Sequence, residues 1–330
     1  VPELRFKGFT DDWEQRKLTE IVNRVNKSSN SDVLPKVEFE DIVSGEGRLN
    51  KDISSKFDSR KGTLFEPENI LYGKLRPYLK NWLFSDFEGV ALGDFWVFEA
   101  TDVSVPSFDY YLIQSDNYQK VANDTSGTKM PRSDWKNVSS TDFAIPSKDE
   151  QKQIGAFFKQ LDNTIVLHQR RLDLLKEQKK GYLQKMFPKN GAKVPELRFA
   201  GFADDWEERK LSDIADRFDN LRVPITASER KSGDTPYYGA NGIQDYVEGF
   251  THDGEFILVA EDGANDLKNY PVQYVNGKVW VNNHAHVLQG KNTITDNKFL
   301  MNSIKNFNIE PFLVGGGRAK LNADVMMKLN

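Results

Sequence analysis

Hydrophobic residues recur at alternating spacings of four and three along residues 147–187. The seam runs through Ile154, Phe158, Leu161, Ile165, His168, Leu172, Leu175, Lys179, Tyr182 and Met186, and eight of these ten positions are apolar or aromatic. A heptad pattern of this length is typical of a coiled-coil helix, whose apolar seam needs a partner along its length. At 1.5 Å per residue the helix spans on the order of 60 Å.

Both ends of this helix have local signals. Pro146 comes before Ser147, and Ser147 with Glu150 forms a capping-box sequence, in which the serine accepts from a helix amide and the glutamate reaches back. Pro188 ends the pattern. We therefore predict a helix over 147–187, followed by a linker over 188–193.

The flanking regions combine short alternating segments with glycine and proline breaks. ENILYGKLRPYLKNWLF and ALGDFWVFEA predict strands or short helices, so the fold class is α+β. The run VWVNNHAHV predicts one strand with His284 and His286 on the same face. No third ligand accompanies the histidines, and we predict no metal site there. The acids Glu261, Asp262 and Asp266 are interpreted as a solvated loop.

The opening of the chain is repeated. VPELRFKGFTDDWEQRKLTEI at Val1 and VPELRFAGFADDWEERKLSDI at Val194 share 16 of 21 residues at a constant offset of 193, while the residues between them diverge. This pattern indicates a duplicated scaffold whose two copies carry different intervening sequences. The predicted domains are a recognition domain over 1–146, the long helix over 147–187, the linker over 188–193, and a second recognition domain over 194–330. Extending the repeat predicts a second long helix after Asn330, so this chain lacks it.

Composition and charge narrow the function classes. The 330 residues contain no cysteine, which excludes disulfides and thiolate metal sites and favours a reducing cytoplasm. No apolar run is long enough to cross a membrane. The net charge is −4, so any nucleic-acid surface must be local. Residues 81–119 hold seven acids and no Lys or Arg, whereas residues 51–80 hold seven bases and four acids.

Sequence signatures of catalysis are missing. There is no GxxxxGK[ST] phosphate loop, no Asn-Pro-Pro-aromatic run of an adenine methyltransferase, and no glycine-rich strand-to-helix turn for a cofactor. Gly315-Gly-Gly317 precedes Arg318 rather than a helix start, and we interpret it as a flexible turn. The chain is predicted to have no catalytic residues and to bind no cofactor itself.

The remaining candidates for a binding site are loops in which basic side chains alternate with aromatic and amide side chains. Arg76 is suited to a guanine edge, Lys74 and Lys80 to phosphates, and Asn241 and Asn322 to adenine. Each loop taken alone is an ordinary surface loop, but the loops recur at matching places in both repeats. The candidate DNA contacts are Lys74, Arg76, Tyr78, Lys80, Thr128, Lys129, Arg132, Tyr238, Asn241, Arg318, Lys320 and Asn322.

Taken together, these segments resemble the DNA-specificity subunit of type I restriction–modification enzymes. The resemblance rests on the repeated PELRF-x-GF-x-DDWE-x-RKL openings, on IPSKDEQKQIGAFFKQLDNTI, on YGKLRPYL and SGTKMPRSDW, and on YYGANGIQDYVEGF and HAHVL. It implies two target-recognition domains, spaced by two antiparallel helices, that read the halves of a bipartite site in double-stranded DNA.

The resemblance also implies partners. Two methyltransferase subunits that carry S-adenosylmethionine would dock along the helices, and two motor-nuclease subunits would supply ATP- and Mg-dependent translocation and cleavage. The helix residues expected at a partner are Ile154, Phe158, Leu161, Ile165, Leu172 and Leu175. The missing second helix departs from the family pattern. Three alternatives stay open: a coiled-coil scaffold that binds proteins, a truncated or decoy specificity subunit, and, less favoured, a self-contained DNA enzyme.

Overall fold

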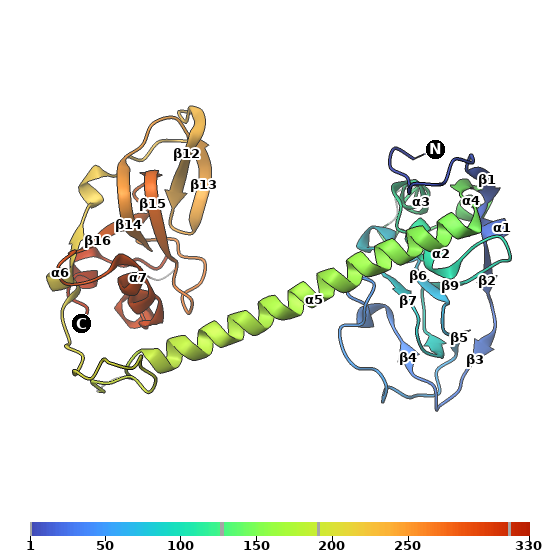
Figure 1. The fold of residues 1–330 in the computed structure, drawn as a ribbon, viewed down its shortest axis with the longest axis horizontal. Helices are drawn as coiled ribbons and strands as arrows, with labels where there is room; N and C mark the ends of the chain where they lie inside the picture. Colours follow the sequence, from blue (N-terminus) through green and yellow to red (C-terminus); the bar gives the residue numbers. More distant parts are fainter. Residues whose placement is uncertain (1, 126–128, 190–191, 316–317) are drawn as a thin grey trace. The chain divides into compact units, whose positions relative to one another are not determined.

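A computed structural model describes residues 2–125, 129–189, 192–315 and 318–330. The chain divides into a first unit, Val1–Arg170, and a second unit, Arg171–Asn330, and the boundary lies within one long helix. Each unit combines helices with β-sheet (Figure 1). The α+β class predicted from the sequence is therefore confirmed.

The long helix α5 is continuous from Lys148 to Met186 and contains 39 residues, about 58 Å at 1.5 Å per residue. This matches the length and position predicted from the heptad pattern. Among the described residues the next longest helix is α7, with 10 residues. Most of the predicted seam is exposed, including Phe158, Leu161, Ile165, Leu172 and Leu175, while Ile154 packs against the core of the first unit.

The predicted capping box at the start of α5 is wrong. Both carboxylate oxygens of Glu150 accept hydrogen bonds at 2.7 Å from Arg5, and the Glu150 side chain is fully buried. The carboxylate turns away from the helix amides because a bidentate guanidinium contact is stronger than one backbone bond. Phe6 adds an edge-on contact with Phe157 at 5.7 Å between ring centroids. The repeated opening segment thus fastens the first turns of α5 to the first unit.

The described residues of the first unit form three sheets and four short helices in addition to the start of α5. The central sheet has the strand order β2-β9-β6-β7, a second has the order β3-β5-β8-β4, and β1 pairs with β10. The strands are β1 (Glu14–Lys17), β2 (Val22–Val25), β3 (Ser28–Ser29), β4 (Lys36–Val37), β5 (Gly62–Phe65), β6 (Ile70–Gly73), β7 (Trp82–Phe84), β8 (Gly89–Ala91), β9 (Phe95–Ala100) and β10 (Asp142–Ile145). The helices are α1 (Leu18–Ile21), α2 (Pro106–Leu112), α3 (Asp116–Ala122) and α4 (Trp135–Ser140), with 3-10 turns η1 (Phe39–Asp41) and η2 (Pro77–Leu79).

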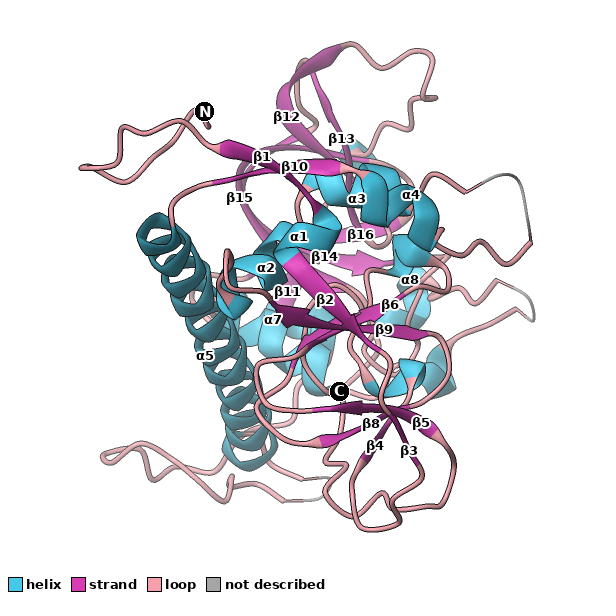
Figure 2. Cartoon of the chain, turned by 90° about the vertical axis from the view of Figure 1, so that its right-hand side faces the viewer, coloured by secondary structure: helices cyan, strands magenta, loops and turns pink. Residues whose placement is uncertain are grey.

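Helices α1 to α4 and the small β3-β5-β8-β4 sheet cover opposite faces of the central sheet, so Tyr72 and Trp96 pack with the helices while Leu71 and Val97 pack with the small sheet (Figure 1, Figure 2). The helix side buries an aromatic core that includes Tyr72, Trp96, Phe98 and Tyr118. Aromatic side chains of this size bury 150–250 Å² each, so a few of them fix the packing of helix on sheet.

Asp109 of α2 is a buried acid within the first unit. Ser104 Oγ lies 2.6 Å from the Asp109 carboxyl and 2.7 Å from the Ile21 carbonyl oxygen. A hydroxyl has one proton to donate, so both contacts are hydrogen bonds only if Ser104 donates to the Ile21 carbonyl and a protonated Asp109 donates to Ser104. Burial raises the pKa of Asp109 to about 8, which agrees with a protonated side chain.

The second unit contains one six-stranded sheet in the order β11-β16-β14-β15-β12-β13. Its strands are β11 (Ala215–Arg217), β12 (Ser232–Gly239), β13 (Gly242–Val247), β14 (His252–Ala260), β15 (Val272–Val281) and β16 (Ala285–Gly290). Its helices are α6 (Leu211–Ile214), α7 (Asn297–Asn306) and α8 (Ala323–Met326), with 3-10 turns η3 (Asp219–Leu221) and η4 (Glu310–Phe312).

One strand prediction in this unit is wrong. VWVNNHAHV is not a single strand, because β15 ends at Val281 and β16 begins at Ala285, with a turn between them that includes His284. Two consecutive asparagines, which favour turns, lie at the break. The two histidines therefore do not share a strand face.

The two units repeat the same four-strand order although their sequences diverge. In each, four antiparallel neighbours follow the order β2-β9-β6-β7 or β11-β16-β14-β15. The registers also match: Val22 faces Ala100 as Ala215 faces Gly290, and Ile70 faces Phe98 as Ile257 faces Leu288. The duplication found in the 21-residue repeat therefore extends through the sheet, and it allows residues to be matched between units by counting along the ladders.

Candidate nucleic-acid interface

The predicted contacts of the first unit gather at the edge where β6 ends and β9 begins. The Lys74 amide donates to the Asp94 carbonyl at 2.8 Å, and the Ser133 amide donates to the Lys74 carbonyl at 2.9 Å. Leu75 forms an antiparallel bridge with Arg132. These backbone bonds bring the loop after β6 beside the segment before α4, two regions that lie more than 50 residues apart in the sequence.

The second unit builds the same backbone arrangement where β14 ends and β16 begins. The Glu261 amide donates to the His284 carbonyl at 2.9 Å, and the Leu321 amide donates to the Glu261 carbonyl at 2.7 Å. Asp262 forms the antiparallel bridge with Lys320. The loop after β14 therefore lies beside the segment before α8.

We call these two arrangements the edge frames. The first comprises Lys74, Leu75, Asp94, Arg132 and Ser133, and the second comprises Glu261, Asp262, His284, Lys320 and Leu321, in matching order. The backbone contacts are the same, yet a lysine is replaced by a glutamate, a leucine by an aspartate and an aspartate by a histidine. A shared scaffold thus presents two chemically different surfaces.

Arg76 occupies a strained position beside the first edge frame. Its backbone is left-handed, with φ of 48°, and its amide donates to the Pro131 carbonyl at 2.7 Å. The matching residue of the second unit is Gly263, with φ of 70°. Lys80 is also left-handed, with φ of 54°. Non-glycine residues adopt this conformation at a cost, and such strain gathers at functional sites.

The other predicted residues of the first unit are exposed on the same loops. Arg76, Tyr78, Lys80, Lys129 and Arg132 are exposed, and Lys74 is half-buried. Thr128 lies outside the described residues. The Lys74 ammonium and the Arg132 guanidinium both face the Asp94 carboxylate, at 4.0 and 3.0 Å. Asp94 was not predicted from the sequence, because only the strand register places it beside the two basic side chains.

In the second unit the predicted residues have more varied surroundings. Asn241 donates to the Gly263 carbonyl and accepts from the Asn265 amide, both at 2.9 Å, so its amide group holds the loop after β14. Tyr238 is half-buried and packs against the core. Asn322 is half-buried at the start of α8. As DNA contacts, these residues remain predictions.

Arg318 and Lys320 lie at the second edge frame and pair with its acids. The Arg318 guanidinium is 3.0 Å from Asp262, and the Lys320 ammonium is 2.9 Å from Glu261. His284 Nδ1 lies 2.6 Å from the same Asp262 oxygen. The interpretation of Glu261 and Asp262 as solvated acids is therefore wrong, since both are largely buried in ion pairs that the local sequence does not reveal.

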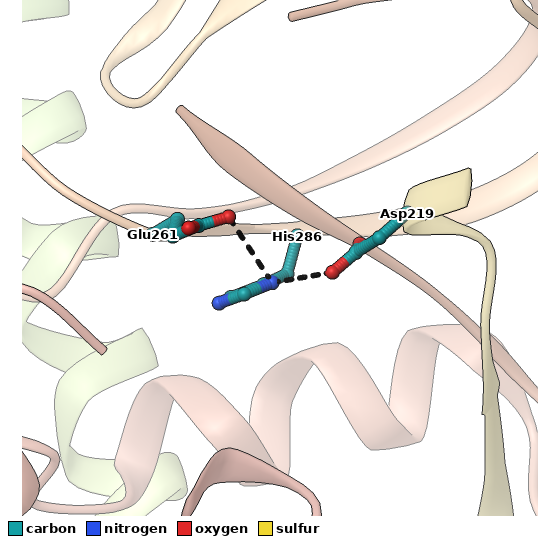
Figure 3. Close-up of side chains that lie close together, drawn as sticks. All are labelled: Asp219, Glu261 and His286. Carbon is teal, nitrogen blue, oxygen red and sulfur yellow. Dashed lines mark hydrogen bonds and ion pairs between the residues drawn. The ribbon is translucent and has the colours of Figure 1, made fainter. Parts of the chain in front are cut away.

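Behind the second edge frame, Asp219, Glu261 and His286 lie close together (Figure 3). His286 Nδ1 faces Asp219 at 2.7 Å, and Nε2 faces the Leu321 carbonyl at 2.8 Å. Arg222 sits 2.7 Å from Glu261. Burial opposes ionisation of Asp219, but His286 and Arg222 outweigh it and lower its pKa. Both ring nitrogens face oxygen atoms, and one ligand atom each of Asp219, Glu261 and His286 lies within 4.8 Å of the others. Together with Arg222 these side chains form a polar network that braces the loop.

Comparison with known proteins identifies the family of the chain. Residues 10–177 and 203–330 match the family described as the type I restriction modification DNA specificity domain. The chain belongs to this family. The two matched segments fall on the two repeated parts of the chain, so family membership and the internal duplication agree.

Two curated relatives are specificity subunits of type I restriction enzymes. One, from Haemophilus influenzae, is 48% identical over 133 residues, which cover 40% of this chain and 34% of the relative. The MjaVIII specificity subunit of Methanocaldococcus jannaschii is 28% identical over 113 residues, covering 33% of this chain and 27% of the relative. The matched regions thus span about a third of these relatives.

Solved structures share the fold. The specificity subunit of a type I restriction-modification system from M. genitalium has a TM-score of 0.69 at 13% identity, covering 100% of this chain and 86% of that one. A chain from a structure of type I system assembly and conformational transition has a TM-score of 0.51 at 17% identity, covering 97% and 85%. The predicted fold, two recognition-type domains with a long helix, is confirmed.

Proposed function

We propose that this chain is the DNA-reading subunit of a type I restriction–modification enzyme and that each edge frame reads one half of a bipartite duplex site. The observation that carries the proposal is the repetition of one backbone frame with unlike side chains. Unlike base sequences require unlike donors and acceptors, whereas a repeated backbone keeps both readers in the same geometry. The recognition domains extend over 1–146 and 194–330 in this proposal.

The first edge frame suits acceptor-rich base edges. Arg76 and Arg132 carry guanidinium forks, which match the O6 and N7 acceptors of guanine, and Lys74, Lys80 and Lys129 suit phosphates. The strained backbone of Arg76 also supports a functional role, because the strain contributes nothing to stability.

Partner subunits supply the chemistry in this proposal. The methyltransferase subunits bind S-adenosylmethionine, and the motor-nuclease subunits use ATP and Mg²⁺, in the cytoplasm. The exposed helix positions Phe158, Leu161, Ile165, Leu172 and Leu175 support a helix-binding partner, since an apolar seam in water is unfavourable. Within the described residues no helix is long and apolar enough to cross a membrane.

The second unit offers a further surface for such a partner. An apolar hollow of about 660 Å³ lies beside the last turns of α5, lined by residues that include Leu175, Tyr182, Phe199, Phe202 and Phe299. Arg198 borders it, and its buried Nη1 atom has no hydrogen-bond partner among the described residues. Its counterpart in the first repeat, Arg5, holds the Glu150 carboxylate, and we infer that this hollow accepts a helix with a carboxylate in its first turn.

Methylation mapping tests the proposal. The chain is co-expressed with its methyltransferase partner, and modified adenines are mapped on genomic DNA. We expect one motif in two blocks, and Arg76→Ala should relax one position of one block by about 1–3 kcal/mol. Lys7→Ala, which removes an exposed cation from the opening segment, is the control. A motif that is unchanged by Arg76→Ala would remove Arg76 from the reading surface, and the absence of any two-block motif would contradict the function.

The exposed seam of α5 also fits a second candidate, a helical scaffold that binds proteins without reading bases. Substitutions in the seam and at the edge frames separate the two candidates. If the chain is only a scaffold, substitutions in the seam, such as Leu172→Asp, abolish partner binding, while substitutions at the edge frames leave every activity unchanged.

A further inference from the structure

In each unit one arginine reaches across the edge frame to an aspartate. Arg132 Nη2 donates to Asp94 Oδ2 at 3.0 Å, and Arg318 Nη2 donates to Asp262 Oδ1 at 3.0 Å. The arginine side chains are 57% and 61% exposed, whereas the aspartates are 25% and 22% exposed. The carboxylates are therefore held inside the frame, and the guanidinium groups project from it.

The contact with the aspartate occupies one corner of each guanidinium. Within the described parts of the chain, Nε and Nη1 of Arg132 and of Arg318 donate no hydrogen bond. A guanidinium presents five N–H donors in a planar fork, so most of the fork remains available on each side chain. An arginine held in place by a carboxylate loses less rotamer freedom when it binds, which improves its geometry for a bidentate contact.

The two aspartates anchor their arginines from opposite sides of the frame. Asp94 directly precedes β9, whereas Asp262 follows β14. By register, the position matching Asp94 is His284, and the position matching Asp262 is Leu75. The aspartate that anchors the arginine thus belongs to one strand in the first unit and to the other strand in the second. The guanidinium consequently projects from a different place on each frame.

Stability does not account for these pairs. An ion pair with one partner more than half exposed contributes about 0–1 kcal/mol. Arg76 differs from both arginines because no side-chain contact anchors it among the described residues and because a glycine, Gly263, takes its place in the second unit. The anchored arginine is the feature that the two units share.

We propose that Arg132 and Arg318 are specificity-determining residues, one in each unit, that donate to a guanine edge in the major groove, and that Asp94 and Asp262 are their positioning residues. The proposal rests on the proposed function, because it assumes that the edge frames meet DNA. It assigns to each half-site one G·C pair whose recognition depends on a single aspartate–arginine contact.

The test maps the methylation motif of the full chain with its methyltransferase partner for four variants. Asp94→Ala should reduce discrimination at one G·C position of one half-site roughly tenfold, and Asp262→Ala should do so in the other half-site only. Asp94→Asn, whose amide oxygen still accepts from the guanidinium, should retain part of the discrimination. Asp86→Ala, an exposed acid after β7, should leave the motif unchanged.

Binding to the mapped site at several salt concentrations separates base contacts from phosphate contacts. If the arginines meet bases, the aspartate variants keep the wild-type salt dependence and the wild-type melting temperature. If the variants instead lose the same affinity for every DNA sequence and show a shallower salt dependence, the arginines contact phosphates and the inference is overturned. An unchanged motif in both alanine variants would overturn it as well. A wild-type chain without a two-block motif would instead contradict the proposed function.

Discussion

Arg76→Gly separates the stability of the first unit from its proposed DNA contact. Arg76 has φ of 48°, and a left-handed backbone costs a non-glycine residue about 1–2 kcal/mol. Glycine removes this cost but adds about 0.5–1 kcal/mol of conformational entropy to the unfolded chain. The difference predicts a gain in the free energy of unfolding of between about 0 and 1.5 kcal/mol, at about 2–4 °C in melting temperature per kcal/mol for a unit of this size. Discrimination at one position of one half-site should be lost in the same variant.

Glu68→Gly is the matched control. Glu68 is exposed and left-handed, with φ of 69°, and is the third non-glycine residue with this backbone among those described. Thermal unfolding and binding to the mapped site are measured for both variants. We expect both variants to be stabilised and only Arg76→Gly to lose discrimination at one position of one half-site. If Arg76→Gly melts lower than the wild type, or binds DNA with unchanged specificity, the assignment of strain to function is wrong.

Three further substitutions test the contacts that build the two units, each by chemical denaturation of the full chain. Arg5→Ala leaves the fully buried Glu150 carboxylate on α5 uncompensated and should cost about 3–5 kcal/mol of unfolding free energy. Arg16→Ala, which removes an exposed ion pair, should cost less than about 1 kcal/mol. Equal costs would contradict the role of the Arg5–Glu150 contact in holding α5 to the first unit. Burial raises the folded-state pKa of Asp109 to about 8, above its unfolded value, so the stability that the protonated acid contributes should be lost as pH rises from about 4 to 8. Asp109→Asn should be at least as stable as the wild type at pH 7, and its unfolding free energy should fall less than that of the wild type over this range. The same pH slope in both proteins would exclude a buried protonated acid. His286→Ala removes the imidazole contacts with the Asp219 carboxylate and the Leu321 carbonyl oxygen and should cost about 2–4 kcal/mol of unfolding free energy. His168→Ala, on the exposed helix, should cost less than about 0.5 kcal/mol. Similar costs would show that the network does not brace the second unit.

The sequence predicted the features that depend on local patterns. The seam through Ile154, Phe158 and the residues that follow has a helical period over many turns, and a long helix forms at that place. The 21-residue repeat indicated two related units, and the sheets do share their strand order. Such features can be predicted because the local structure of each residue depends mainly on its neighbours along the chain.

The features that the sequence analysis missed depend on distant residues. The capping box at Glu150 did not form because Arg5, 145 residues away, takes its carboxylate. Asp94 and Asp262 were not recognised as partners of Arg132 and Arg318 because strand register brings them together. No spacing along the chain encodes these contacts. The match between the two edge frames likewise becomes visible only when residues are counted along the ladders.

The exchange of one recognition domain tests the central claim most directly. Residues 22–146, which contain the first edge frame, are replaced by the equivalent segment of another specificity subunit, and the methylation motif is mapped again with the partner methyltransferase. Two independent readers predict that one block of the motif changes and the other stays the same. A change in both blocks, or in neither, would contradict the account.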